Sequence, residues 1–200
     1  MIPGDQILDN PRAYLFWQGK FAEQKLAPLK AHNDLLSVRR VLDVGCGPGT
    51  NTRHFTSAGY LGVDMNPAYI DYARKHHHRD FLMADVCQYS APPGEKYDFI
   101  LANSFLHHID LANTKRILSH LSTLLTEDGH VHIIEVVLPP QAGLPRQLAL
   151  WDRGRFVRPL KEWKQIFSEQ FEPLVFEPFW LTKFGVKLWN MVYFKGKVRS

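Results

Sequence analysis

The sequence predicts an α/β domain in which a doubly wound, mostly parallel sheet ends in a C-terminal antiparallel hairpin. Strand-like and helix-like patterns alternate from residue 40 to residue 138, which is typical of parallel strands with helices on both faces. One apolar strand runs straight into a turn with glycines at alternate positions, Gly45, Gly47 and Gly49. From residue 159 the alternation stops, and one helix precedes two strand-like segments joined near Gly185.

The elements are expected in the following order. The parallel strands cover residues 40–44, 60–63, 81–86, 97–103 and 130–137, and the helices between them cover residues 50–57, 67–77 and 111–125. The third helix ends in Thr126-Glu127-Asp128-Gly129, a helix-stop and turn signal. A helix over 159–169 and strands over 171–181 and 187–194 complete the chain.

The glycine-rich turn predicts a nucleoside-cofactor site. A strand, such a turn and a helix start open a βαβ unit, where the backbone approaches a ligand closely and a Cβ would be in the way. A dinucleotide site has Gly-x-Gly-x-x-Gly, but here the third glycine comes one residue early, and no Gly-Lys-Ser/Thr follows to bind phosphates. Taken singly, a glycine turn is often only a tight connection, and an Asp after a strand is often a helix N-cap.

The pattern Asp43-x-Gly45-x-Gly47-x-Gly49 resembles the first motif of the class I S-adenosylmethionine (SAM) dependent methyltransferases. This resemblance implies a Rossmann-like, seven-stranded sheet, SAM as cofactor and S-adenosylhomocysteine as product. It also implies that Asp64, 21 residues after Asp43, accepts hydrogen bonds from the ribose hydroxyls, and that Asp85 meets the adenine amino group. The implied cofactor-binding residues are Asp43, Gly45, Gly47, Gly49, Asn51, Asp64, Met65, Asp85, Val86, Asn103 and Ser104.

Two residues are candidates for catalysis. His108 lies in the segment after the fourth strand, which resembles the segment that flanks the transferable methyl group, and a neutral imidazole accepts a proton near pH 7. The alternative is a histidine that only caps or packs under the following helix. Glu135, near the end of the fifth strand, is the second candidate base, although it can equally pair with a nearby Arg.

No metal is expected. His76, His77 and His78 follow one another at a helix end, where consecutive side chains point in different directions, so solvent exposure is preferred over metal binding. Enzymes that methylate amino groups of nucleic acids carry Asn/Asp/Ser-Pro-Pro-Tyr/Phe after the fourth strand, whereas this chain has Asn103-Ser104-Phe105-Leu106. A nucleobase amine is therefore disfavoured as acceptor.

Two segments outside the alternation are expected to cover the site. Residues 10–32 form an amphipathic helical stretch with aromatic residues, and residues 139–158 form an arginine-containing connection. The candidate substrate-binding residues are Tyr14, Trp17, Trp151, Arg153 and Arg155. Core packing is the alternative for the aromatics. For the arginines, recognition of an anionic or lipid-like small molecule ranks first, structural anchoring through Asp152 or Glu162 second, and RNA third.

Composition limits the other possibilities. The 200 residues with 45% hydrophobic content are expected to form a single domain, 1–200, made of a lid helix (10–32), a SAM-binding core (40–138), the connection (139–158) and a C-terminal unit (159–200). Two cysteines, no basic-then-apolar start and no long apolar run favour a cytoplasmic protein. We expect either a monomer or a homodimer.

The C-terminal part of the chain is basic: residues 141–200 hold 11 of the 24 Lys and Arg residues but 5 of the 20 Asp and Glu residues. This basic end attracts an anionic small molecule, acidic lipid or nucleic acid, or is a solvated face, so peripheral membrane contact stays open.

The resulting functional expectation is methyl transfer from SAM to a small-molecule acceptor, preferably O-methylation of an anionic or lipid-like secondary metabolite, with no nucleic-acid partner. The alternatives are a SAM-binding protein that transfers no methyl group and an RNA methyltransferase.

Overall fold

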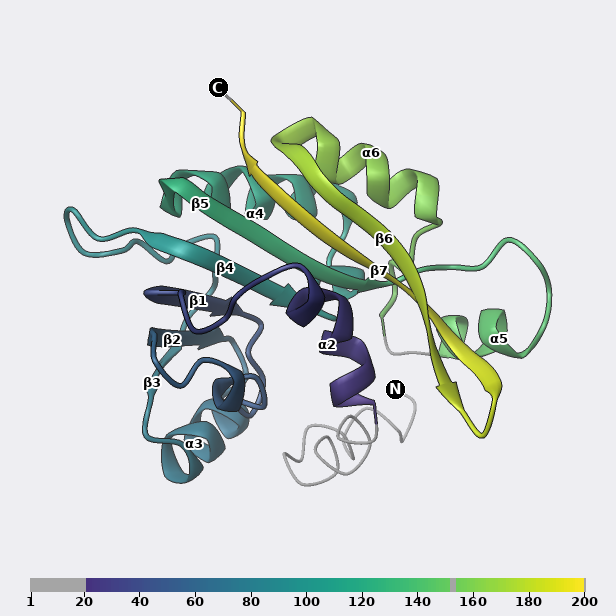
Figure 1. Ribbon diagram of the computed structural model, residues 1–200, viewed down its shortest axis with the longest axis horizontal. Coiled ribbons are helices and arrows are strands. Elements are labelled where there is room, and N and C mark those ends of the chain that lie inside the picture. Colours follow the sequence, from purple (N-terminus) through teal and green to yellow (C-terminus); the bar gives the residue numbers. More distant parts are fainter. Residues whose placement is uncertain (1–20, 152–153, 200) are drawn as a thin grey trace.

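The computed structural model describes residues 21–151 and 154–199 and contains one seven-stranded sheet, in the order β3-β2-β1-β4-β5-β7-β6 (Figure 1). Five strands run parallel: β1 (Arg40–Val44), β2 (Gly59–Asp64), β3 (Asp80–Met83), β4 (Tyr97–Asn103) and β5 (Leu125–Val136). The hairpin strands β6 (Phe171–Lys183) and β7 (Val186–Val198) are antiparallel, and β7 pairs with β5. The predicted doubly wound sheet with a C-terminal hairpin is confirmed.

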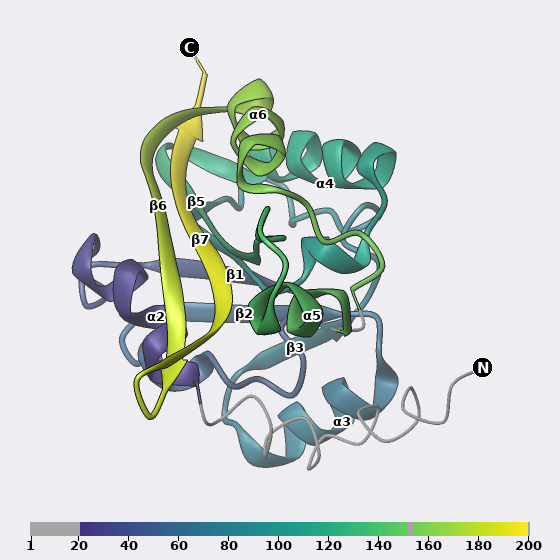
Figure 2. The same cartoon turned by 90° about the vertical axis from the view of Figure 1, so that its right-hand side faces the viewer.

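Helices cover both faces of the sheet. On one face α4 (Leu111–Leu124) and α6 (Leu160–Gln170) pack over the sheet, and on the other lie α2 (Ala22–Ala31), α3 (Pro67–His76) and α5 (Leu144–Trp151). Figure 2 shows α4 and α6 together on the side away from α2. Strand β4 explains this arrangement, because Ile100 and Ala102 face the α4–α6 core while Phe99 and Leu101 face the other.

The prediction of a helix over residues 50–57 is wrong. The structure has only one 3-10 turn there, η1 (Thr52–His54), and the chain then extends toward β2. The guanidinium of Arg79 donates hydrogen bonds to the backbone carbonyls of Phe55, Thr56 and Ala58 at 2.8–3.0 Å. These tertiary bonds satisfy the carbonyls after the turn without a helix, and a local sequence pattern does not reveal them.

Three further segments also differ from expectation. The third strand ends at Met83 rather than residue 86, because Asp85 Oδ1 accepts the amide of Cys87 and starts a tight turn. Residues 126–129 lie within β5 as an irregularity between two registered pairs, Leu125 with Tyr97 and His130 with Phe99. The connection 139–158 contains the helix α5, whose Ala149 is buried against the sheet.

Within the described ranges, 21–151 and 154–199, no helix is long and apolar enough to span a bilayer.

Candidate functional site

The glycine turn lies at the carboxyl end of β1, in the middle of the sheet. Gly45, Gly47 and Gly49 all have left-handed backbone, with φ of 66°, 54° and 81°. A Cβ on Gly45 would lie 2.5 Å from Cδ2 of Phe105, so this position has neither the conformation nor the space for a side chain. The amides of Gly45 and Cys46 both donate to the carbonyl of Val63, which holds the turn against the end of β2.

Beneath the turn, Asp43 is fully buried and forms the centre of a polar network. Its Oδ2 accepts hydrogen bonds from Asn51 Nδ2 at 3.0 Å and from the hydroxyl of Tyr60, while Asn103 Nδ2 donates to Asn51 Oδ1 at 3.3 Å. Its Oδ1 is buried without a hydrogen-bond partner among the described residues. Burial raises the pKa of the Asp43 carboxyl to about 6, against the hydrogen bonds from Tyr60 and Asn51. The network joins the carboxyl ends of β1 and β4.

Asp64 ends β2 beside the turn. Its Oδ2 accepts the amide of Gly47 at 2.9 Å, and its Oδ1 accepts the amide of Asn66 at 2.8 Å. Burial raises its pKa, although the backbone hydrogen bonds oppose that shift. An ionised carboxylate has about four acceptor sites, so two amides leave acceptor capacity for a ligand.

The remaining predicted cofactor residues lie along the same edge. Met65 is 69% exposed directly after Asp64, whereas Val86 is buried. Asp85 is half-buried after β3 and accepts hydrogen bonds from Cys87 N and Gln88 Nε2. The structure therefore brings the ends of β1, β2, β3 and β4 to one edge, in the order that parallel topology requires.

The segment after β4 is a fixed turn. Ser104 has a left-handed φ of 55°, and its amide donates to the carbonyl of Ile134 at 2.7 Å. The 3-10 turn η2 (Leu106–His108) follows, and Glu135 lies fully buried beneath it. Glu135 Oε1 accepts the amides of Phe105 and Leu106 at 2.9 and 2.5 Å.

The two histidines of η2 occupy different surroundings. His107 is buried, and its Nδ1 lies 2.7 Å from Glu135 Oε2. His108 is exposed at the carboxyl edge, with its ring centroid 4.1 Å from that of His107. Pairing of Glu135 with an Arg, one of the sequence alternatives, is replaced in the structure by this contact with His107, a residue that sequence analysis did not single out.

Of the predicted substrate residues, Tyr14, Trp17 and Arg153 lie outside the described residues. Trp151 is 75% exposed at the end of α5, and Arg155 is exposed after it. They lie on the segment that returns from α5 to η2, since the amide of Phe156 donates to the carbonyl of His107 at 2.9 Å.

Arg158 has the anchoring role that was one alternative for the arginines. Its side chain is 95% buried, and its guanidinium lies 4.8 Å from the centre of the Trp163 ring and pairs with Glu162 at 3.3 Å. It also donates to the carbonyls of Leu106 and Ile109, on both sides of η2. The connection is thus tied to the turn that carries His108.

His77 corrects another expectation, because it is half-buried rather than solvent-exposed. Its Nε2 lies 3.1 Å from the carbonyl of Pro48, and its Nδ1 lies 3.3 Å from Thr52 Oγ1. Burial lowers its pKa, so the neutral ring is favoured. This histidine braces the glycine turn from α3, a role that only the fold shows. In the part of the chain that the structure describes, no three His, Cys, Asp or Glu side chains cluster as metal ligands.

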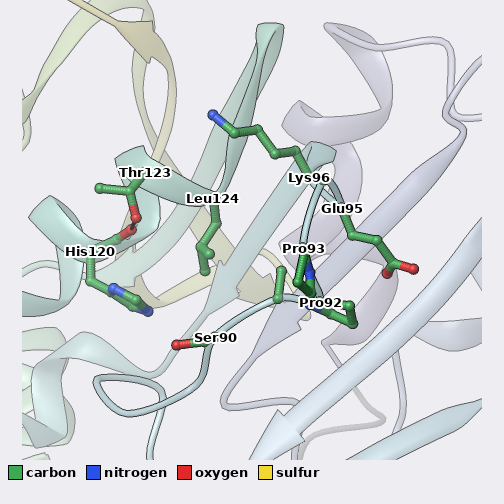
Figure 3. A pocket seen from close by; sticks show the side chains of 10 residues that line it. Ser90, Pro92, Pro93, Glu95, Lys96, His120, Thr123 and Leu124 are labelled. Atoms are coloured by element: carbon green, nitrogen blue, oxygen red, sulfur yellow. Dashed lines mark hydrogen bonds between the residues drawn. The ribbon is translucent and has the colours of Figure 1, made fainter.

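Two hollows differ in their relation to this edge. The one at the glycine turn is closed by α2 and lined by Ala22, Lys25, Leu26, Thr50, Asn51, His54 and Asn103. Figure 3 shows the other, of about 320 Å³, between the loop before β4 and the end of α4; His120, Thr123, Glu95 and Lys96 are among its residues. Since that loop enters the amino end of β4, the second hollow lies at the opposite edge of the sheet.

Known proteins share both the sequence of this core and its architecture. A family profile described as "Methyltransferase domain" matches residues 41–129. Trans-aconitate 2-methyltransferase of Klebsiella pneumoniae is 31% identical over 176 residues, which cover 80% of this chain and 66% of the relative. The enzyme of that name from Delftia acidovorans is 34% identical over 109 residues, 50% of this chain and 39% of its own length. The chain thus spans less than two-thirds of these relatives.

Solved structures with low sequence identity share the fold. A SAM-dependent methyltransferase from Methanosarcina mazei superposes with a TM-score of 0.71 at 18% identity, over 86% of this chain and 98% of its own. Phosphoethanolamine N-methyltransferase 2 of Haemonchus contortus, solved in complex with SAM, has a TM-score of 0.74 at 15% identity, over 100% of this chain and 61% of its own.

Proposed function

Since this chain belongs to the class I SAM-dependent methyltransferases, we propose that it transfers a methyl group from SAM to a small anionic acceptor, at oxygen. The observation that carries the proposal is the glycine turn stacked over the Asp43 network, with Asp64 beside it at the carboxyl edge of the sheet. Ligands of open α/β sheets bind at this edge.

The residues present fit SAM. The orphaned Oδ1 of Asp43 is suited to an amino group, and an acceptor of this kind is needed where the amino-acid end of SAM would lie. Asp64 keeps acceptor sites for ribose hydroxyls, and the carboxylate of Asp85 is the acceptor that we assign to the adenine amino group. Asn51 and Asn103 hold the Asp43 carboxylate in position.

The chemistry divides between cofactor and chain. When bound, SAM supplies a methyl group activated by its sulfonium. The chain has to hold the acceptor in line with that group, exclude water and remove the proton of a hydroxyl acceptor. His108, exposed at the edge, takes the proton, while Glu135 and His107 position the turn from below. Glu135 is thereby reassigned from candidate base to positioning residue, because it is fully buried beneath three donors.

An anionic acceptor is supported by the charges around the site. Lys25, 8% exposed, and the half-buried His54 line the hollow between α2 and the glycine turn. Burial and the charges of Lys30 and Arg53 lower the pKa of His54 to about 4, so it stays neutral and acts as a hydrogen-bonding group. The exposed Arg155 is the cation offered to a carboxylate. The relatives' name supports this class, because trans-aconitate is a tricarboxylate.

Calorimetric titration of the purified protein with SAM, S-adenosylhomocysteine and NAD tests the cofactor. Selective binding of the first two, lost in Asp64→Ala, is the expected result; binding of NAD alone would overturn the proposal. Leu36→Ala is the matched control, since Leu36 is exposed and lies before β1 at the opposite edge.

Transfer is tested with isotope-labelled SAM, trans-aconitate as first acceptor and a cell extract as second. Label in a small acidic product is expected and would be lost in His108→Ala. SAM binding without label in any product would favour a binding protein without transfer. Label in RNA, with binding that weakens steeply with salt, would favour the RNA alternative.

A further inference from the structure

The tip of the β6–β7 hairpin projects past the parallel sheet. Val136, the last residue of β5, pairs with Met191, so residues 186–190 of β7 and the facing end of β6 extend beyond the carboxyl end of β5. The tip turns through Phe184 and Gly185, which have φ of 52° and 76°. Figure 1 shows this tip farther out than any parallel strand. It therefore overhangs the edge of the sheet that carries the candidate site.

The tip presents apolar side chains to solvent. Phe184 is 94% exposed and Val186 is 50% exposed. The neighbouring helix α5 contacts β7 and adds three more exposed apolar residues, Leu144, Leu150 and Trp151. A large ring held outward at a tight turn contributes nothing to the core, and such patches mark interaction sites.

Positive charge surrounds the aromatic tip. The Nζ of Lys183 lies 5.4 Å from the ring centroid of Phe184, and the Nζ of Lys187 lies 5.1 Å from that of Trp180. Residues 180–190, which form the tip, contain these two lysines and no Asp or Glu. A symmetric contact between two copies would bring the lysines of both tips together, which disfavours a second copy as the occupant.

We propose that the β6–β7 tip docks on an anionic lipid surface. Phe184 enters the interfacial layer of the bilayer, while Lys183 and Lys187 lie at the level of the lipid phosphates, which their positive charge complements. Because the tip overhangs the candidate site, docking brings that site next to the membrane. The proposal does not depend on the identity of the acceptor or on methyl transfer.

Sedimentation of the purified chain with vesicles, in the absence of SAM, tests this docking. Binding to vesicles of phosphatidylcholine mixed with phosphatidylglycerol is expected, with little binding to phosphatidylcholine alone and loss at high salt. Phe184→Ser is expected to lower the partition coefficient roughly tenfold or more. Lys183→Ser and Lys187→Ser are each expected to lower it about fivefold.

The control is Leu36→Ser, which removes an apolar side chain of similar exposure, 73%, at the opposite edge of the sheet. It should bind vesicles as the unmodified chain does. Unchanged thermal melting of Phe184→Ser shows that the fold is intact, because Phe184 is not part of the core. Equal vesicle binding by Phe184→Ser and Leu36→Ser would overturn the proposal, as would a concentration-dependent dimer that Phe184→Ser abolishes. Failure of SAM binding would leave this result unaffected.

Discussion

The glycine turn after β1 and the β6–β7 tip both need left-handed backbone, but their surroundings are opposite. Gly45 and Gly185 have similar φ, 66° and 76°, yet a Cβ on Gly45 would lie 2.5 Å from Phe105, whereas one on Gly185 would meet no atom of the described residues within 4 Å. Asp43 below the turn is fully buried, and Phe184 at the tip is 94% exposed. The cofactor edge is built by packing, while the tip is free to meet a partner.

Replacing each glycine with alanine should give the largest difference between the two regions, measured as the free energy of unfolding. Gly45→Ala combines a left-handed penalty with overpacking, so the free energy of unfolding should fall by about 3 kcal/mol. Gly185→Ala has only the first cost and should lose about 1 kcal/mol. Chemical denaturation of both variants measures the difference. Equal losses would show that the packing around Gly45 relaxes freely.

Substitutions in the turn that carries His108 should affect turnover, because the proposed catalytic residue lies at the edge with the glycine turn. Substitutions at the β6–β7 tip should not affect it. His108→Ala should reduce turnover by about 10²-fold or more without changing SAM affinity. Glu135→Gln should weaken the pairing with His107 and lower both turnover and thermal stability. Lys183→Ser at the tip is the control for turnover on a dissolved acceptor. Unchanged turnover in His108→Ala would remove this residue from the mechanism.

The raised pKa of Asp43 makes the cofactor edge sensitive to pH. With a pKa of about 6, the carboxyl is mostly protonated at pH 5 and mostly ionised at pH 7, so SAM affinity should rise roughly tenfold over that range if the carboxylate binds the amino group. Folding raises this pKa, so the free energy of unfolding of the ligand-free chain should fall as pH rises through 6. Calorimetry and denaturation at several pH values check both trends.

Asp43→Asn provides the control for these slopes. It keeps the size of the side chain but cannot ionise, so the contributions of this group to both pH dependences should disappear. Persistence of the same slopes in Asp43→Asn would assign them to another group whose pKa folding raises, such as Asp64.

The smallest effect is expected on the exposed side of the site. Arg155→Ala should raise KM for a carboxylate acceptor by about three- to tenfold while leaving kcat and SAM affinity unchanged, because an exposed charge contributes about 1 kcal/mol to binding. Steady-state kinetics with trans-aconitate measures the split between KM and kcat. A fall in kcat alone would place Arg155 in catalysis instead.

Much of the cofactor edge was predictable from residues close together in the chain. The strand that ends at Val44, the alternate glycines and the acid that ends β2 occur where their spacing indicates, because each depends on backbone geometry over a few residues. The predictions of a helix over 50–57 and of a solvent-exposed His77 were wrong because contacts between distant parts of the chain decide both features. Arg79 and Pro48, which decide them, are distant in sequence.

The sequence by itself therefore determined the sheet class and the glycine turn, since these rest on periodicity and local backbone requirements. The glycine motif also carried the resemblance to the methyltransferase family. Only the tertiary structure decided that Glu135 and Arg158 brace the turn of His108, and that Phe184 stands clear of the core. Burial and side-chain pairing depend on which strands and helices meet in space. No local pattern of residue types specifies those tertiary contacts.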